Sequence, residues 1–170
     1  MSCFLVIMGV SGCGKTTVTS AVAERLADSV FLEGDDFHPP ANKKKMGNGI
    51  PLTDEDRRPW FAELNAAAQE AVGQGKTPVL ACSALKEEYR EALFRGFNKP
   101  RLVFLKGSFD LIKSRMDARD HEYMTSTLLE SQFATLEEPE AGENVLVLSI
   151  DETPEEIVNR VVDWVEDRRR

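Results

Sequence analysis

The residues 9–16, Gly-Val-Ser-Gly-Cys-Gly-Lys-Thr, constrain the fold of this chain more than any other stretch. They match G-x-x-x-x-G-K-[ST], the pattern of a phosphate-binding P-loop, at every fixed position. The apolar run 3–8 before them is typical of a buried parallel strand. Residues 17–27 after them carry apolar side chains at helical spacing, namely Val18, Val22 and Leu26. Because a strand, a glycine loop and a helix agree, a chance glycine turn is disfavoured.

The P-loop pattern assigns a role to its residues. Glycines let the backbone take positive φ and approach phosphates closely, and the exposed N–H groups form an anion nest at the positive end of a helix. Lys15 is expected to reach the β- and γ-phosphates of a nucleotide, and Thr16 to offer its hydroxyl to Mg²⁺. The expected nucleotide-binding residues are Gly9, Val10, Ser11, Gly12, Cys13, Gly14, Lys15, Thr16 and Thr17.

Length and composition limit the class of protein. The 170 residues suit one domain, 1–170, and a hydrophobic content of 42% suffices for a full core. No apolar run is long enough to span a bilayer, and the N-terminus lacks the basic leader of a secretory signal. Three cysteines without a Cys-x-x-Cys pair indicate reduced thiols in the cytoplasm and disfavour disulfides or a zinc site. A net charge of −8 disfavours non-specific binding to nucleic acid.

Strands and helices alternate, which predicts an α/β fold in which helices cover both faces of a parallel sheet. Five strands are expected, at 3–8, 29–33, 78–82, 101–105 and 145–150. Helices are expected at 17–27, from Thr53 to Gly73, and at 86–95, 109–119, 125–133 and 154–166. This is the three-layer αβα P-loop NTPase fold, whose ligands bind at the carboxyl edge of the sheet. Residues 34–52 are expected to form a long irregular loop, and 168–170 a frayed tail.

Acidic residues follow the second strand, beside the expected phosphate site. In a strand Glu33 and Asp35 point to the same side. Asp35 is a candidate base or hydroxyl-orienting group, and Glu33 a candidate partner of Mg²⁺ through water. An acidic turn without function is the alternative, and spacing does not separate the two. His38 is a weaker candidate, because a loop histidine before two prolines is more often structural.

Basic residues in two segments are candidates for binding a substrate. Lys45 and Arg57 flank the glycine-rich stretch 46–51, and Arg57 is suited to hold a carboxylate with two parallel hydrogen bonds. Lys43 and Lys44 are more typical of a solvated face. The turn 82–86 supplies a further candidate, Ser83, and the alternative for Ser83 is a helix cap.

Arg115 and Arg119 lie four residues apart, so they share one face of a helix. Ahead of a polar segment they look like arginines that close over a transferring phosphoryl group, a role that is worth about 10³–10⁵ in rate. The alternative is surface pairing with the neighbouring Asp117 and Asp120.

Taken together, these residues resemble the gluconokinases of the P-loop kinase group, small enzymes related to shikimate and adenylate kinases. The resemblance covers nearly the whole chain and is most specific in the stretches 34–60 and 82–86. Besides the P-loop, it is carried by Gly34-Asp35, His38-Pro39, Asn42, Lys45-Met46, Gly49 to Leu52, Asp54, Asp56-Arg57, Pro59-Trp60, Cys82 to Lys86, Tyr89-Arg90, Leu105 to Phe109, His121, Gln132-Phe133, Thr135 to Glu137 and Pro139.

The resemblance implies transfer of the γ-phosphoryl group of ATP to the 6-hydroxyl of D-gluconate, which gives 6-phosphogluconate and ADP. It implies a homodimer, a substrate-binding insert at about 34–60, a mobile lid at about 118–126, and a loop with Pro139 near the adenine. The implied catalytic residues are Lys15, Asp35, Arg115 and Arg119, and the two arginines also bind ATP. The implied substrate-binding residues are Asp35, His38, Lys45, Arg57, Ser83 and Lys86.

Other functions stay open at this point. A kinase for another small hydroxy acid such as shikimate, or for a nucleoside monophosphate, would use the same fold. A nucleotide-dependent switch would also bind nucleotide, although it would not need the acids and bases that follow the second strand. A degenerate P-loop protein is disfavoured because Lys15 and Thr16 are intact.

Overall fold

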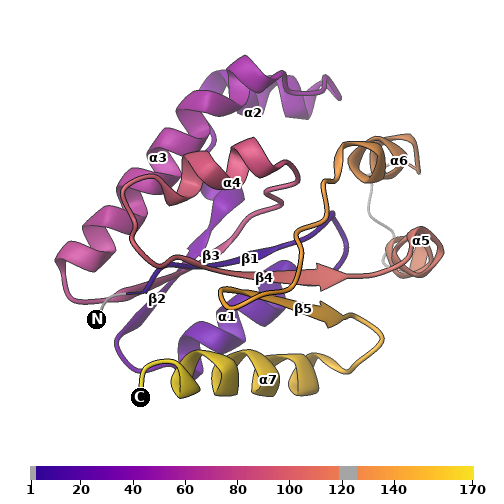
Figure 1. Ribbon diagram of the computed structural model, residues 1–170. Helices are drawn as coiled ribbons and strands as arrows, with labels where there is room; N and C mark the ends of the chain where they lie inside the picture. Colours follow the sequence, from indigo (N-terminus) through magenta and orange to yellow (C-terminus); the bar gives the residue numbers. More distant parts are fainter. Residues whose placement is uncertain (1–2, 119–125) are drawn as a thin grey trace.

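The computed structural model describes residues 3–118 and 126–170 of the chain (Figure 1). Within them, five parallel strands form one sheet in the order β2-β3-β1-β4-β5. The strands are β1 (Leu5–Met8), β2 (Ser29–Glu33), β3 (Thr77–Ala81), β4 (Arg101–Lys106) and β5 (Val145–Ser149). Each begins and ends within two residues of its expected bounds, so the expected α/β fold with a five-stranded parallel sheet is confirmed.

Helices cover both faces of the sheet, as the three-layer architecture requires (Figure 1). On one face lie α1 (Lys15–Arg25) and α7 (Pro154–Asp167), and on the other α3 (Asp54–Gly73) and α4 (Glu87–Phe94). Beyond the ends of β4 and β5 lie α5 (Phe109–Ala118) and α6 (Ser126–Thr135). The segments that follow the strands therefore meet at one edge of the sheet, where all strands end.

Two apolar clusters, one on each face, hold the three layers together. Alternate residues of β1 divide between them, since successive side chains of a strand point to opposite faces. Leu5 and Ile7 pack in the cluster of α1 and α7, whereas Val6 and Met8 pack in the cluster of α3 and α4. All four are fully buried, and burial of such a side chain stabilises the fold by about 1.5–3 kcal/mol.

The expectation of a long irregular loop at 34–52 is wrong. A 3-10 helix, η1 (Gly34–Phe37), follows β2 directly, and α2 (Pro40–Gly47) follows η1. Pro40 suits the first turn of a helix because its φ is fixed and its missing N–H would have no partner there. Lys44 and Lys45 lie in the last turn, where positive charge interacts favourably with the helix dipole. Asp35 therefore belongs to η1 and not to a strand, so strand alternation does not explain its position.

The expectation of a frayed tail at 168–170 is also wrong for its first two residues. Arg168 donates from Nε to the carbonyl of Glu143 at 3.0 Å, and its guanidinium lies 4.9 Å from the ring centre of Trp164. Arg169 donates to the hydroxyl of Thr77 at 2.8 Å. These contacts tie the end of α7 to the segment before β5 and to the start of β3.

Helix starts differ in how they are capped. Thr53 with Asp56 forms a capping box at α3, and Thr153 with Glu156 forms one at α7, in which side chains satisfy the free N–H groups. Helix α1 instead follows Gly14, which has φ 95° and no side chain to cap with.

Among the described residues, no helix combines the length and the apolarity needed to cross a membrane.

Candidate active site

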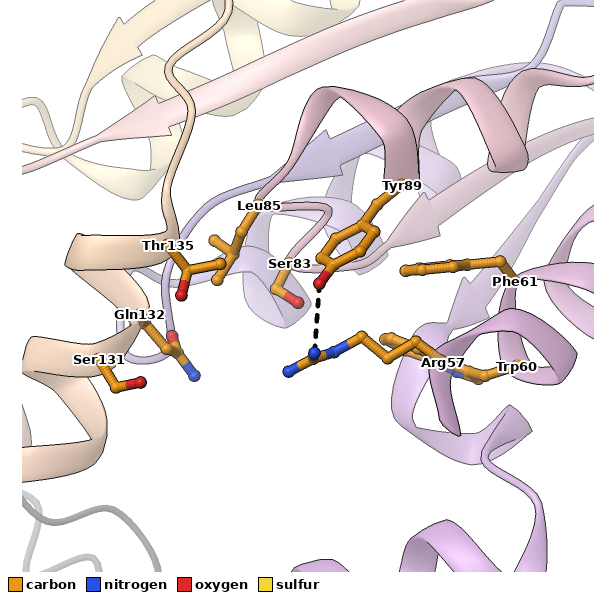
Figure 2. A pocket seen from close by; sticks show the side chains of 9 residues that line it. All are labelled: Arg57, Trp60, Phe61, Ser83, Leu85, Tyr89, Ser131, Gln132 and Thr135. Carbon is orange, nitrogen blue, oxygen red and sulfur yellow. Dashed lines mark hydrogen bonds between the residues drawn. The ribbon is translucent and has the colours of Figure 1, made fainter. Parts of the chain in front are cut away.

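A cavity of about 790 Å³ opens at the carboxyl edge of the sheet. Its walls come from the P-loop and the start of α1, the ends of β2 and β3, η1, α2 with residues 49–52, α3 and α6. A smaller pocket of about 90 Å³ shares five lining residues with it (Figure 2). The shared residues are Arg57, Trp60, Ser83, Ser131 and Gln132.

The P-loop needs its glycines for different reasons. Gly12 has φ 82°, and a Cβ on it would lie 2.8 Å from Cγ of Met116. Gly14 has φ 95° and open space around it, so only the backbone conformation demands glycine there. Val10 and Cys13 point into the core, which anchors the loop from below. The loop can therefore turn its N–H groups outward while its apolar side chains stay buried.

The cationic end of the P-loop matches the expected phosphate site. Lys15 lies in the first turn of α1 and lines the cavity. Its ammonium donates to the carbonyls of Gly9 and Val10, at 2.9 Å and 3.1 Å. The expected nucleotide residues that line the cavity are Ser11, Gly12, Gly14, Lys15, Thr16 and Thr17.

Thr16 and Glu33 meet at the rim of the same cavity. The hydroxyl of Thr16 donates to Oε2 of Glu33 at 2.6 Å, although the two residues are 17 positions apart. A hydroxyl and a carboxylate are the hard oxygen ligands that Mg²⁺ takes, usually alongside waters and substrate phosphates. Among the described residues, no group of three or more His, Cys, Asp or Glu side chains could hold a metal alone. This donor set fits a cation that is shared with a nucleotide.

Asp35 presents an exposed carboxylate to the cavity. Its side chain is 80% exposed, and its backbone N–H donates to Oε1 of Glu33 at 3.5 Å. Oδ1 of Asp35 lies 3.9 Å from Nε2 of His38. The acid therefore stands at the tip of β2, next to the phosphate loop, as the sequence predicts.

His38 is buried and stacks on Trp60, with ring centres 3.9 Å apart and planes at 20°. Burial lowers the pKa of His38, against the opposing effect of Asp35, so the neutral ring is favoured. Among the described residues, Nδ1 has no hydrogen-bond partner. Trp60 in turn donates from its indole N–H to the carbonyl of Gly34 at 2.8 Å, which fixes η1 against α3.

Arg57 is held by a tyrosine and an aspartate (Figure 2). Its Nη1 donates to the hydroxyl of Tyr89 at 3.2 Å and lies 3.7 Å from Oδ1 of Asp54. The Tyr89 hydroxyl donates to the same carboxylate oxygen. This hydrogen bond lowers the pKa of Asp54, while burial raises the pKa of Tyr89, so the pair stays a phenol and a carboxylate. Figure 2 shows the guanidinium pointing from α3 into the pocket.

Lys45 and Lys86 form ion pairs with carboxylates, and neither residue lines the cavity or the pocket. Lys45 lies 2.8 Å from Oδ2 of Asp56, and this hydrogen bond lowers the pKa of Asp56 to about 2. Lys86 lies 3.4 Å from Oδ2 of Asp54. Lys43, which the sequence favours as a solvated side chain, does line the cavity although it is exposed.

Ser83 lines both the cavity and the pocket. The alternative that Ser83 caps a helix is wrong, because α4 begins at Glu87 with Lys86 in the capping position. Ala84 next to it has φ 45°, so the turn is tight. The turn presents the Ser83 hydroxyl to the same space as the guanidinium of Arg57 (Figure 2).

The structure does not bring Arg115 or Pro139 to the cavity lining. Arg115 donates from Nη2 to the carbonyl of Ile150 at 2.7 Å, beyond the end of β5. Its expected surface partner, Asp117, instead pairs with Lys113 at 3.5 Å. Arg119 and most of the expected lid lie outside the described residues, so the roles of both arginines stay predictions.

Several residues of the site have no local signal in the sequence. Gln132 of α6 bonds to Ser11 across 121 positions, and Ser131 lies beside it in the pocket. Trp60 and Tyr89 have the spacing of core residues, and they do pack in the core, yet both also line the pocket. The resemblance includes all of these residues except Ser131, without giving any of them a role.

The phosphate loop, the acid at the tip of β2 and the adjoining pocket lined by Arg57 define a P-loop kinase. Residues 4–139 match a family model described as an AAA domain. The thermoresistant gluconokinase of Escherichia coli (strain K12) is 44% identical over 161 residues, which cover 94% of this chain and 91% of that protein. The chain belongs to the gluconokinase family.

Two solved structures share the fold over nearly their full length. A sugar kinase from Janibacter sp. HTCC2649, solved without ligand, superposes with a TM-score of 0.89 at 40% identity and covers 98% of this chain and 95% of that one. A gluconokinase from Sinorhizobium meliloti 1021 superposes with a TM-score of 0.83 at 39% identity, with 96% and 91% covered. The architecture derived above is therefore that of related kinases.

Proposed function

We propose that this protein is an ATP-dependent gluconokinase that phosphorylates the 6-hydroxyl of D-gluconate. One observation carries the proposal. A single cavity is lined both by the P-loop, which binds phosphates, and by Arg57, which is suited to a carboxylate. Gluconate has a carboxylate at one end and a primary alcohol at the other, so it can be held by Arg57 while its alcohol faces the phosphate site. The family membership of the chain supports this substrate.

On the nucleotide side, the P-loop amides and the start of α1 bind the phosphates, and Lys15 adds a positive charge. Thr16 and, through water, Glu33 are the residues to hold Mg²⁺, which neutralises charge on the phosphates when bound. The proposal keeps Pro139 near the adenine, and it keeps Arg115 and Arg119 as the arginines that complete the site when a lid at about 118–126 closes. It also keeps the homodimer that the resemblance implies and the cytoplasmic location that the cysteines indicate.

On the acceptor side, Asp35 takes the proton of the substrate hydroxyl as the hydroxyl oxygen bonds to the γ-phosphorus and ADP leaves. Its exposed carboxylate can reach an alcohol in the cavity. Arg57 and Ser83 bind the sugar acid in the pocket, and His38 forms part of its wall. Lys45 and Lys86 contribute indirectly, because their partners Asp56 and Asp54 lie in the first turn of α3.

A panel of acceptors in a coupled ADP-release assay tests the substrate. Gluconate is expected to stimulate ADP release strongly, and the phosphorylated position can be read by NMR of the product. If gluconate gives no signal and shikimate or a nucleoside monophosphate does, the substrate assignment is wrong. Tight nucleotide binding with slow hydrolysis and no stimulation by any acceptor would favour a nucleotide-dependent switch.

Replacing Asp35 by asparagine tests the proposed base. Asp35→Asn is expected to lower kcat by about 10²–10⁴ with little change in KM, because general-base catalysis contributes about this much. Asp36→Asn is the matched control, since Asp36 is the exposed neighbour in the same 3-10 helix and does not line the cavity. A rise in KM alone for Asp35→Asn would reassign this residue to substrate binding.

A further inference from the structure

The side-chain amide of Gln132 makes two hydrogen bonds to one residue of the P-loop. The backbone N–H of Ser11 donates to Oε1 of Gln132 at 2.8 Å, and Nε2 of Gln132 donates to Oγ of Ser11 at 3.0 Å. One amide thus uses both its acceptor and a donor on the same partner. Such a paired contact fixes the distance and the orientation of the loop relative to α6.

The paired contact also fixes the direction of the Ser11 hydroxyl. Because Oγ accepts a hydrogen bond from Gln132, its own proton is left for another acceptor. Among the described residues, no side chain or carbonyl takes this proton. Ser11 lines the cavity beside Gly12 and Lys15, so the proton is available to a phosphoryl oxygen there.

Gln132 also lines the smaller pocket of about 90 Å³, which is the acceptor pocket in the proposed function. Figure 2 shows Gln132 and Ser131 across the pocket from the guanidinium of Arg57. The loop after α6 holds the other wall, since the N–H of Glu137 donates to the carbonyl of Leu85 at 2.8 Å. The carboxylate of Glu137 also accepts from the N–H of Glu87 at 2.8 Å, at the start of α4. The segment from α6 to residue 137 therefore contacts both the phosphate loop and the turn 82–86 beside the pocket.

We propose that Gln132 is a positioning residue for phosphoryl transfer, which acts through Ser11 to hold the P-loop in fixed geometry relative to the acceptor pocket. The inference rests on the proposed function, in which an alcohol in the pocket attacks the terminal phosphorus in line. A loop that can shift against the pocket loses this alignment, and small misplacements of reacting groups cost large factors in rate.

The test uses Gln132→Met, which keeps the length of the side chain and removes both hydrogen bonds, together with Ser11→Ala and the double variant. Gln74→Met is the matched control, because Gln74 is exposed at the end of α3 and lines neither cavity nor pocket. Calorimetry measures binding of a non-hydrolysable ATP analogue without acceptor. The coupled assay then gives kcat and KM with gluconate, and thermal unfolding confirms the fold.

Gln132→Met is expected to weaken binding of the analogue about fivefold and to lower kcat about tenfold, as the loss of one to two hydrogen bonds predicts. KM for gluconate should change less than about threefold, because Gln132 acts on alignment rather than on acceptor binding. The double variant should be no more than about twofold worse than the poorer single variant, since both changes break the same contact.

The proposal is overturned if Gln132→Met matches Gln74→Met in analogue binding and kcat, or if the losses of the two single variants multiply in the double variant. Should Gln132→Met fail to fold, Gln132→Ala carries the same criteria, because it also removes both hydrogen bonds to Ser11. If the wild-type protein does not use gluconate, the proposed function fails, while the analogue affinities still decide whether Gln132 acts through Ser11.

Discussion

Gly34 lies where η1 meets the end of β3, and replacing it by alanine tests how tightly this contact positions Asp35. A Cβ atom on Gly34 would lie 2.5 Å from the carbonyl oxygen of Ala81 and 3.4 Å from Cβ of Cys82. The obstacle is the backbone of a buried strand, which cannot rotate aside. The indole of Trp60 holds the Gly34 carbonyl, so η1 must break or stretch this hydrogen bond to move away.

The magnitude follows from this geometry. Real Cβ contacts are not found under 3.0 Å, so a contact at 2.5 Å requires a shift of about 0.5 Å or more. Forcing a methyl group into a packed site costs about 1–3 kcal/mol of unfolding free energy. For a chain of 170 residues, this lowers the unfolding midpoint by about 2–12 °C. Because Asp35 is the next residue, kcat should also fall about tenfold.

Calorimetric unfolding and the coupled assay with gluconate measure the two effects. Gly73→Ala is the control, because Gly73 ends α3 and a Cβ there meets no described atom within 4 Å. In that helical position alanine is expected to stabilise the fold by about 0.5–1 kcal/mol and to leave kcat unchanged. If Gly34→Ala unfolds with the wild type and keeps its kcat, the argument from close packing is refuted.

Three further changes probe single side chains. Lys15→Met should keep the fold by circular dichroism and lose at least about 10²-fold in kcat, because the charge that stabilises the transferring phosphate is gone; near-normal turnover would contradict this. Tyr89→Phe removes one of the two side chains that hold the guanidinium of Arg57 and leaves Asp54 as the other, so KM for gluconate should rise about threefold to tenfold with kcat nearly kept. A selective rise in KM for ATP would speak against this role. His38→Asn should flatten the dependence of stability on pH. Burial lowers the pKa of His38 below 6.5, so its contribution to stability is present above pH 6.5 and is lost as the pH falls toward the folded pKa. Unfolding midpoints from about pH 8 to about pH 5 measure this, and equal slopes in wild type and variant would exclude it.

The fold could be predicted from the sequence because its signals are local. Each strand is a short apolar run, and the glycines of residues 9–16 mark the turn from β1 into α1. The helix α2 escaped prediction because proline, glycine, asparagine and lysine in its sequence are common in loops. Its proline at the first turn and its lysines at the last are helix signals only once the ends of the helix are known.

The candidate site could be predicted only where its residues follow strand ends. Thr16, Glu33, Asp35 and Ser83 lie near the carboxyl edge by topology, and the structure brings all four to the cavity. The ion pair of Lys45 could not be predicted, because its partner Asp56 lies on another helix. The contact of Gln132 with Ser11 likewise depends on how α6 packs, which no local pattern encodes.

The bare start of α1 has a consequence for how nucleotide binding affects the fold. Helices α3 and α7 are capped by a threonine and an acidic residue, whereas α1 follows Gly14 in the left-handed conformation and has no side-chain cap. The first N–H groups of α1 can therefore bind an anion. A bound triphosphate then caps the N-terminus of the helix and is also the reactant. Nucleotide binding should slow amide hydrogen exchange in the first turn of α1 first, because the bound phosphates complete the hydrogen bonding of this turn.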